Sequence, residues 1–247
     1  MKKLILALAL ISSLFACKKE TSTPNNSGNN TTDTTKTSNK TIGKPGPNIT
    51  DSEGNTYKTV FIGTQQWMAE NLKVSKYNDG TSIPNIIDNT QWENNNTGAW
   101  AYNNNDATNN AKYGKLYNWY AVSPTTNGNK NVCPTGWHVP TDAEWTVITD
   151  YLGGKSVAGG KLKEVGTTNW NSPNTDATNT SLFSALPGGN RFDNGKYGNM
   201  GSDGCWWSST EYNTDNARYC NLSYYNGIVY SNTRVKEYGF SVRCLKD

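Results

Sequence analysis

Cysteine is the residue type that most constrains the chemistry of this sequence. The chain contains Cys17, Cys133, Cys205, Cys220 and Cys244. Cys17 ends an export signal described below, so the other four are expected in an oxidising compartment where disulfides are the default, and four cysteines allow three pairings. Cys205 and Cys220 lie about equally far from an intervening loop and could face each other across two strands. That pairing leaves Cys133 with Cys244.

The residues that catalysis or metal binding needs are scarce. His138 is the only histidine, and neither a Cys-x-x-Cys nor a Gly-x-Ser-x-Gly motif is present. A typical zinc site or a Ser-His-Asp triad would therefore depend on one imidazole. His138 lies between Trp137 and Val139, which favours a structural role, and the carboxylates of Glu211 and Asp215 flank a hairpin loop. We predict no catalytic residue, no metal ligand and no enzymatic activity.

Aromatic and polar residues near two motifs are better suited to binding. The segments LPGGNR and WWSSTEY, with the residues that follow them, supply Arg191, Trp206, Trp207, Tyr212 and Arg218. Sugar faces stack on aromatic rings, and sugar hydroxyls pair with polar side chains, so these five are the candidate ligand contacts. The alternative is structural, because one of two adjacent tryptophans in a strand must point into the core.

One helix is well specified by its ends. Thr141 and Glu144 form a capping box, and apolar residues recur at Trp145, Ile148 and Leu152. Gly153 supplies a residue that tolerates the left-handed conformation at the helix end. The pattern predicts a helix from about Asp142 to Leu152.

The other elements are short and separated by loops. A second helix is expected at Lys115–Val122, with Tyr117-Asn118-Trp119 in the core, and the segment Gly153–Pro187 is expected to be mostly loop. Asn226-Gly227 predicts a type I′ hairpin turn. Strands are expected at Thr56–Ile62, Gln66–Leu72, Cys205–Ser208, Ala217–Tyr224, Ile228–Ser231 and Gly239–Leu245. The predicted fold is α+β, with two helices packed on small antiparallel sheets and with long loops.

The N-terminal segment predicts export and a lipid anchor. Two lysines precede an apolar run at Leu4–Phe15 that is too short to span a membrane, which is typical of a signal peptide. The residues up to Cys17 resemble a bacterial lipobox, which predicts a signal peptide at 1–16 and a lipidated Cys17; the alternative is an ordinary signal peptide with an incidental cysteine. Residues 17–48 are polar and predict a disordered tether. The folded domain is then expected at 49–247.

The charge balance argues against a nucleic-acid partner. The chain has 23 basic and 20 acidic residues, and removal of the signal peptide takes away two of the basic ones. No basic cluster lies within the domain, whereas nucleic-acid binding requires one. The expected partners are the membrane, through the lipid, and a polysaccharide or a surface protein.

Five motifs occur in an order that resembles a known family. TVFIGTQQWMAENLK, CPTGWHVPTDAEW, LPGGNR, WWSSTEY and GFSVRC resemble the Fibrobacter succinogenes major paralogous domain. GWHVPTDAEW is also similar to a signature of the formylglycine-generating enzymes, whose fold is a variant of the C-type-lectin-like fold. The resemblance implies that fold, and Cys133–Cys244 would match its long-range bridge. Those enzymes bind copper through a closely spaced cysteine pair, whereas fourteen residues separate Cys205 from Cys220.

These observations predict a lipoprotein of the bacterial cell envelope, anchored in the outer membrane and exposed at the cell surface. Its domain would be non-catalytic and would bind carbohydrate or another surface component. The alternatives are an enzyme related to the formylglycine-generating family and a structural subunit of a surface assembly. No cofactor is expected. The calcium-binding Glu-Pro-Asn and Gln-Pro-Asp tripeptides of C-type lectins do not occur, so a calcium site is assigned to no residue.

Overall fold

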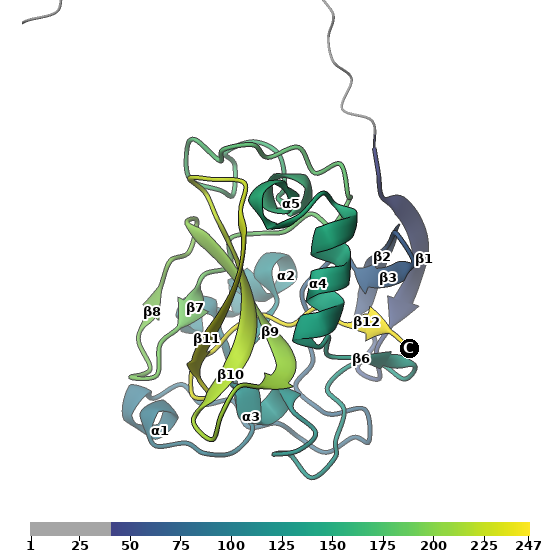
Figure 1. The fold of residues 1–247 in the computed structure, drawn as a ribbon. Helices are drawn as coiled ribbons and strands as arrows, with labels where there is room; N and C mark the ends of the chain where they lie inside the picture. Colours follow the sequence, from purple (N-terminus) through teal and green to yellow (C-terminus); the bar gives the residue numbers. More distant parts are fainter. Residues whose placement is uncertain (1–40) are drawn as a thin grey trace, which may run out of the picture. The chain divides into compact units, whose positions relative to one another are not determined.

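The computed structural model describes residues 41–247, which belong to one compact unit. Cys17, the expected signal peptide and the expected tether as far as residue 40 lie outside these residues. The described part is α+β, with small antiparallel sheets, few helices and long loops (Figure 1). The general fold class is therefore confirmed.

A five-stranded sheet joins the two ends of the domain. Its order is β1-β2-β3-β12-β6, and every pairing is antiparallel. The strands predicted at Thr56–Ile62 and Gln66–Leu72 are confirmed as β2 and β3, although β3 ends earlier than predicted, at Met68. The strand bounds are Lys44–Thr50 for β1, Thr56–Ile62 for β2, Gln65–Met68 for β3, Leu245–Lys246 for β12 and Trp137–His138 for β6.

The folded part begins earlier than the boundary expected at residue 49. Lys44 already pairs with Phe61 in β2, and the backbone N–H groups of Ile42 and Gly43 both donate to the Thr180 carbonyl. β1 is mostly exposed, so it is held by backbone hydrogen bonds rather than by apolar side chains. For this reason its polar composition did not reveal it.

A second, three-stranded sheet forms the centre of the C-terminal half. It contains β9 (Asp203–Glu211), β10 (Asn216–Ser223) and β11 (Val229–Val235) in the antiparallel order β11-β10-β9. The three predicted strands are confirmed and are longer than predicted at most ends. The prediction of a last strand at Gly239–Leu245 is wrong for most of its length, because residues 239–241 make only isolated bridges.

The turn between β10 and β11 also differs from the prediction. Leu222 pairs with Val229, so the connection is longer than two residues. A type I′ turn needs a positive φ at both central residues, and neither Asn226 nor Gly227 has one. The side chain of Asn226 instead accepts a hydrogen bond from the Ile228 N–H.

The predicted central helix is confirmed as α4 (Asp142–Tyr151), with Leu152 as its C-cap. The Thr141 Oγ1 accepts from the Glu144 N–H at 3.2 Å, and the Glu144 carboxylate accepts from the Thr141 N–H at 2.7 Å. Gly153 has φ +101°, as the helix end requires. A further helix, α5 (Lys155–Leu162), follows in the segment that was predicted to be loop.

The second predicted helix is divided. Lys115–Tyr117 forms strand β5, and only Trp119–Val122 is helical, as α3. Asn118 lies between them and caps α3 by accepting from the Ala121 N–H, so the polar residue that ends the strand also starts the helix. Tyr117 and Trp119 are buried, as predicted. The remaining elements are β4 (Trp100–Tyr102), β7 (Asn190–Arg191), β8 (Tyr197–Gly198), α1 (Asn89–Glu93), α2 (Asn110–Tyr113) and the 3₁₀ turns Asn103–Asn105 and Ala107–Asn109.

The β9–β11 sheet separates two apolar clusters. On one side, which we call the helix face, Trp206, Cys220 and Leu222 pack with α4, α5 and the first sheet. On the other side, which we call the cavity face, Trp207 and Tyr219 pack with Tyr117 and other residues from the loops. Figure 1 shows α4 and α5 on one side of this sheet and β7 and β8 on the other. Successive side chains alternate between faces, so β9 contributes to both clusters.

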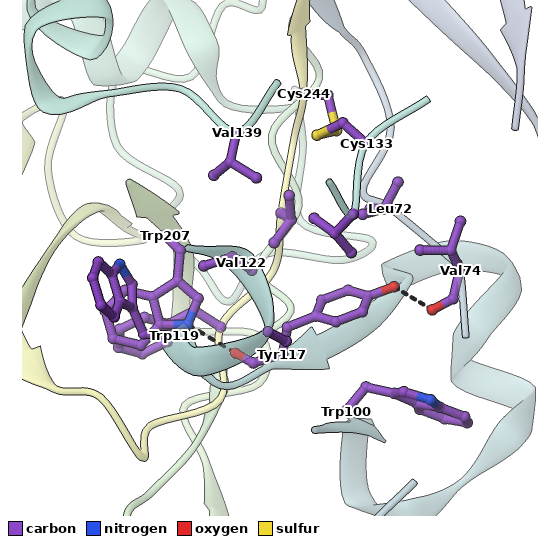
Figure 2. Packing of buried hydrophobic residues seen from close by; sticks show 14 of the residues in the cluster. Leu72, Val74, Trp100, Tyr117, Trp119, Val122, Cys133, Val139, Trp207 and Cys244 are labelled. Carbon is purple, nitrogen blue, oxygen red and sulfur yellow. Dashed lines mark hydrogen bonds between the residues drawn. A yellow bond between two sulfur atoms is a disulfide. The ribbon is translucent and has the colours of Figure 1, made fainter. Parts of the chain in front are cut away.

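Buried polar atoms in the second cluster are paired. Figure 2 shows the Trp207 Nε1 donating to the Tyr117 carbonyl, and the Tyr117 hydroxyl donating to the Val74 carbonyl. The distances are 2.8 and 2.6 Å. Unpaired buried polar groups are costly, so these hydrogen bonds hold the two rings in fixed positions within the core.

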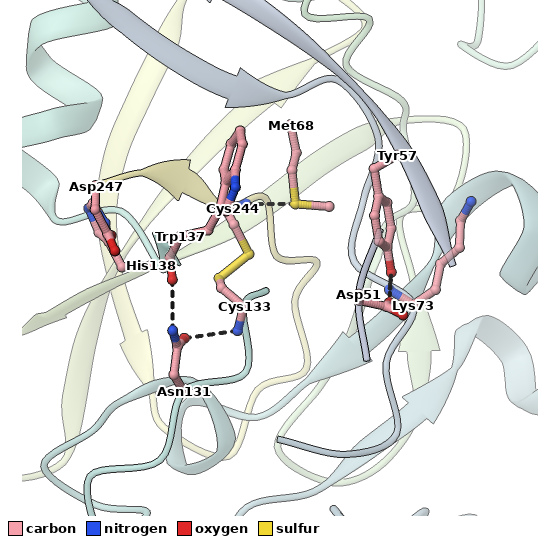
Figure 3. Close-up of a disulfide and its surroundings, with 10 residues drawn as sticks. All are labelled: Asp51, Tyr57, Met68, Lys73, Asn131, Cys133, Trp137, His138, Cys244 and Asp247. Carbon is pink, nitrogen blue, oxygen red and sulfur yellow. Dashed lines mark hydrogen bonds and ion pairs between the residues drawn. A yellow bond between two sulfur atoms is a disulfide. The ribbon is translucent and has the colours of Figure 1, made fainter. Parts of the chain in front are cut away.

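The predicted disulfide between Cys133 and Cys244 is confirmed, with the two Cα atoms 5.9 Å apart (Figure 3). The Asn131 side chain supports it by accepting from the Cys133 N–H and donating to the Trp137 carbonyl. The predicted pairing of Cys205 with Cys220 is wrong, because both thiols are free. Cys220 lies opposite Trp206, while Cys205 lies opposite Asn221. This offset of one residue directs the two thiols to opposite faces of the sheet.

Candidate functional site

Arg191, expected to contact a ligand, is instead fully buried. Its guanidinium group donates to the carbonyls of Gly195 and Ile87, at 2.8 and 2.9 Å. It also stacks on Trp92, with 4.3 Å from Cζ to the ring centroid. Arg191 thus fastens the β7–β8 hairpin to the segment before α1, and it has no surface to offer a ligand.

The two tryptophans of the WWSSTEY motif are also buried. Trp206 and Trp207 are each 0% exposed and point to opposite faces of the sheet. The Nε1 of Trp206 donates to the Asn71 Oδ1 at 2.9 Å. The structural alternative therefore holds for both rings, whereas the sequence argument required it for only one.

Tyr212 and Arg218 remain at the surface and are close together. Tyr212 is 54% exposed, and the guanidinium of Arg218 lies 4.7 Å from its ring centroid. The pair lies by the turn between β9 and β10. Of the five candidates, the structure brings only these two together in an accessible position.

A cavity of about 260 Å³ lies on the cavity face of the β9–β11 sheet. Three parts of the chain line it: the sheet, the region of the β7–β8 hairpin, and the segment that leads toward the C-terminus. The sheet supplies side chains that alternate along its strands, which are Asp203, Cys205, Tyr219, Asn221, Tyr230, Asn232 and Arg234.

A reciprocal arrangement of tyrosine and asparagine is the main feature of this cavity. Tyr219 pairs with Asn232 across β10 and β11, and Asn221 pairs with Tyr230. The cavity floor therefore presents two phenol rings and two amides in a diagonal pattern. The sequence signal was available, since Tyr-x-Asn occurs once in each strand (219–221 and 230–232), but it was not recognised.

Aromatic rings form one wall of the cavity. Phe240 stacks on Tyr219 with 4.6 Å between ring centroids, and Tyr238 packs against Phe240 at 5.7 Å. Phe192 extends the wall from the other side, 5.8 Å from Tyr238. Such rings supply flat apolar surface whose polar edges can still hydrogen-bond.

Amide groups of the β7–β8 region also line the cavity. Asn190 is 2% exposed, and its Oδ1 accepts from the Nδ2 of Asn199 at 2.7 Å. Its own Nδ2 has no acceptor among residues 41–247. Most buried polar groups have a partner, so this donor is an unusual feature of the cavity wall.

The ionisable groups of the cavity are poor nucleophiles. Burial raises the pKa of the Cys205 thiol to about 12 and that of Tyr219 to about 12. A thiol must lose its proton to react, so Cys205 is a neutral and inert group here. Burial also raises the pKa of the Asp203 carboxyl, although the neighbouring Ser223 and Asn221 side chains oppose the shift. The cavity therefore offers hydrogen bonds and ring faces rather than a reactive group.

His138 has no free ring nitrogen. Its Nδ1 lies 2.7 Å from the Asp247 carboxylate, and its Nε2 lies 3.0 Å from that of Glu144. Cys205 and Cys220 cannot bind one copper ion together, because they lie on opposite faces of the sheet. In the part of the chain that the structure describes, no group of three or more His, Cys, Asp or Glu side chains is arranged to hold a metal ion.

A larger cavity of about 530 Å³ lies beside β1 and β2. Its lining mixes charged residues such as Lys58 and Glu70 with aliphatic ones such as Val60 and Leu182. It has no aromatic ring, so it lacks the combination of stacking surface and amides found on the β9–β11 sheet.

Comparison with known proteins gives one match. A family model described as the Fibrobacter succinogenes major domain matches residues 60–246, which is more than half of the chain. No curated protein and no solved structure matches. Between residues 41 and 247, no helix is both long and apolar enough to cross a membrane.

Proposed function

The chain belongs to the Fibrobacter succinogenes major domain family, and from that premise we propose that it is a non-catalytic binding protein that holds carbohydrate in the cavity on the β9–β11 sheet. The observation that carries this proposal is the crossed pair of Tyr-x-Asn segments beside an aromatic wall. The cavity combines aromatic rings, on which a sugar ring can stack, with several amides that can hydrogen-bond its hydroxyl groups.

The chemistry of the lining supports binding rather than turnover. A sugar ring presents C–H groups on its faces and hydroxyl groups around its edge. The faces fit against rings such as Phe240 and Tyr238, while Asn221 and Asn232 can both donate to and accept from hydroxyls. The high pKa of Cys205 argues against nucleophilic catalysis at the same place.

The proposal includes a location and a fold family. The N-terminal sequence up to Cys17 supports a lipoprotein of the outer membrane that carries its domain at the cell surface. A C-type-lectin-like fold is supported by the Cys133–Cys244 bridge over 111 residues. It is also supported by the position of β12 beside β3, which brings the two ends of the domain together.

A glycan array probed with residues 41–247 tests the function. The wild-type domain should retain a subset of the glycans, and Asn232→Ala and Tyr230→Ala should each lower retention about five- to thirtyfold, since a hydrogen bond lost from a binding site costs roughly 1–2 kcal/mol. Tyr212→Ala is the matched control, because its ring is exposed but lies outside the cavity. Failure to retain any glycan, or equal losses in the control and the cavity variants, would refute the proposal.

A further inference from the structure

The cavity on the β9–β11 sheet carries two opposite charges toward its two ends. Arg234 on β11 lies opposite Ala217 of β10, whereas Asp203 on β9 lies opposite Ser223 of the same strand. The two charged residues are thus separated by six positions along the central strand. A ligand that spans the cavity meets a cation at one end and a carboxyl group at the other.

Arg234 differs from Arg191 and Arg243 in having unused donors. Arg191 and Arg243 are buried, and several carbonyl groups saturate their guanidinium groups. The guanidinium of Arg234 is exposed, and its one hydrogen bond within residues 41–247 goes to the adjacent Thr233 carbonyl at 3.2 Å. No acidic side chain in the same range pairs with it.

Two aromatic rings hold Arg234 beside the cavity. Its Cζ lies 5.8 Å from the ring centroids of both Tyr219 and Tyr238, and both rings line the cavity. A guanidinium group held in this way presents a planar pair of N–H donors, which matches the two oxygens of a carboxylate. Arg218 also stacks on a tyrosine ring, but it is only partly exposed and its partner, Tyr212, lies outside the cavity.

We propose that the cavity prefers acidic glycans, with the carboxylate of a hexuronic-acid residue on Arg234 and its neutral hydroxyls toward Asp203. This inference rests on the proposed function. Asp203 would accept hydroxyl donors and would repel a second anion, so the charge pattern also fixes the direction in which the glycan lies. A neutral glycan would keep the stacking and amide contacts and lose only the contact with Arg234.

Calorimetric titration with a matched pair of ligands tests the preference. One ligand is a hexuronic-acid oligosaccharide, and the other is the same oligosaccharide with its carboxyl groups reduced to alcohols. The wild-type domain should bind the acidic form about ten times more tightly or better, because a hydrogen bond to a charged group contributes roughly 1.5–3 kcal/mol. Arg234→Gln should abolish the difference by weakening binding of the acidic form about tenfold or more, while Arg218→Gln should keep the difference.

Equal affinity for the two forms, or a preference that survives Arg234→Gln, would overturn this inference while leaving the proposed function intact. Binding of neither form, together with an empty glycan array, would overturn the proposed function itself. A sulfated form of the reduced oligosaccharide separates carboxylate recognition from general attraction to anions. If it binds as tightly as the acidic form, the assignment to hexuronic acids is wrong.

Discussion

His138 joins the first turn of α4 to Asp247. Burial lowers the pKa of this imidazole. The hydrogen bonds with Asp247 and Glu144 raise the pKa, and together they outweigh the effect of burial, so the net shift is upward. Burial raises the pKa of Glu144, while hydrogen bonds from Thr141 and His138 outweigh that effect and lower it. Each partner therefore stabilises the charged form of the other.

This arrangement predicts how stability depends on pH. The contribution of His138 is fully present below its ordinary pKa of 6.5 and is lost as the pH rises through the higher pKa of the folded state. The contribution of Glu144 is present above its ordinary pKa of 4.5 and is lost as the pH falls through its lowered pKa. Thermal unfolding of wild type and His138→Gln should differ most between about pH 4.5 and 6.5, and the two curves should converge at alkaline pH. A difference that is constant from pH 5 to 10 would contradict this assignment.

Arg191 and Arg218 contrast a fully buried arginine with a partly exposed one. Arg191→Leu should lower the free energy of unfolding by roughly 3 kcal/mol or more, because the carbonyls that the guanidinium satisfies would stay buried without a donor. Arg218→Leu, at the surface, should change it by about 0.5 kcal/mol or less. Urea denaturation of the two variants measures both effects, and comparable losses would mean that Arg191 is not structural.

At the scale of elements, α5 depends on a glycine. A Cβ on Gly159 would lie 2.7 Å from the carbonyl oxygens of both Gly227 and Ile228. The helix can therefore approach the turn between β10 and β11 only because this position has no side chain. The residues that make the contact possible also make the helix hard to recognise in the sequence.

A substitution at this glycine should reverse the usual preference. Alanine normally favours a helix over glycine by about 0.5–1 kcal/mol, but Gly159→Ala should lower the free energy of unfolding by about 1–3 kcal/mol through overpacking. Ser156→Ala, at an exposed position of the same helix, should be neutral or slightly stabilising. Chemical denaturation followed by circular dichroism distinguishes the two, and a stabilising Gly159→Ala would show that α5 can move away from the turn.

These elements indicate which features can be inferred from a sequence. The capping box at Thr141 and Glu144 is local, so α4 was predicted almost to the residue. Gly159 depends on a backbone contact across 68 residues of sequence, and Arg191 hydrogen-bonds carbonyls more than a hundred residues earlier in the chain. Neither dependence leaves a local pattern. The cavity on the β9–β11 sheet was missed for a related reason, since the two Tyr-x-Asn segments become meaningful only when the register of β10 and β11 is known.

At the scale of the whole described domain, the Cys133–Cys244 disulfide connects the loop before α4 to the residue that directly precedes the final strand, β12. It spans 111 residues. In the chain-entropy account, a loop of this length lowers the entropy of the unfolded chain and so stabilises the folded state by about 4–5 kcal/mol. The double variant Cys133→Ser, Cys244→Ser should lose about that much stability in guanidinium denaturation. Dithiothreitol should produce a similar loss in the wild type and no loss in the variant. An unchanged denaturation midpoint in the variant would show that packing alone holds the last strand.

The free thiols of Cys205 and Cys220, on opposite faces of the β9–β11 sheet, can report local opening of the structure on each face. Burial raises the pKa of both groups, and each is at most 5% exposed, so an alkylating reagent reacts only slowly with either thiol until the surrounding structure opens. Cys220 becomes accessible to the reagent when α4 moves away from the sheet. Cys205 becomes accessible when the wall of the cavity opens. The rates of alkylation at the two thiols, measured separately by mass spectrometry, therefore report the two motions in one sample. A sugar bound in the cavity should slow the labelling of Cys205 more than that of Cys220.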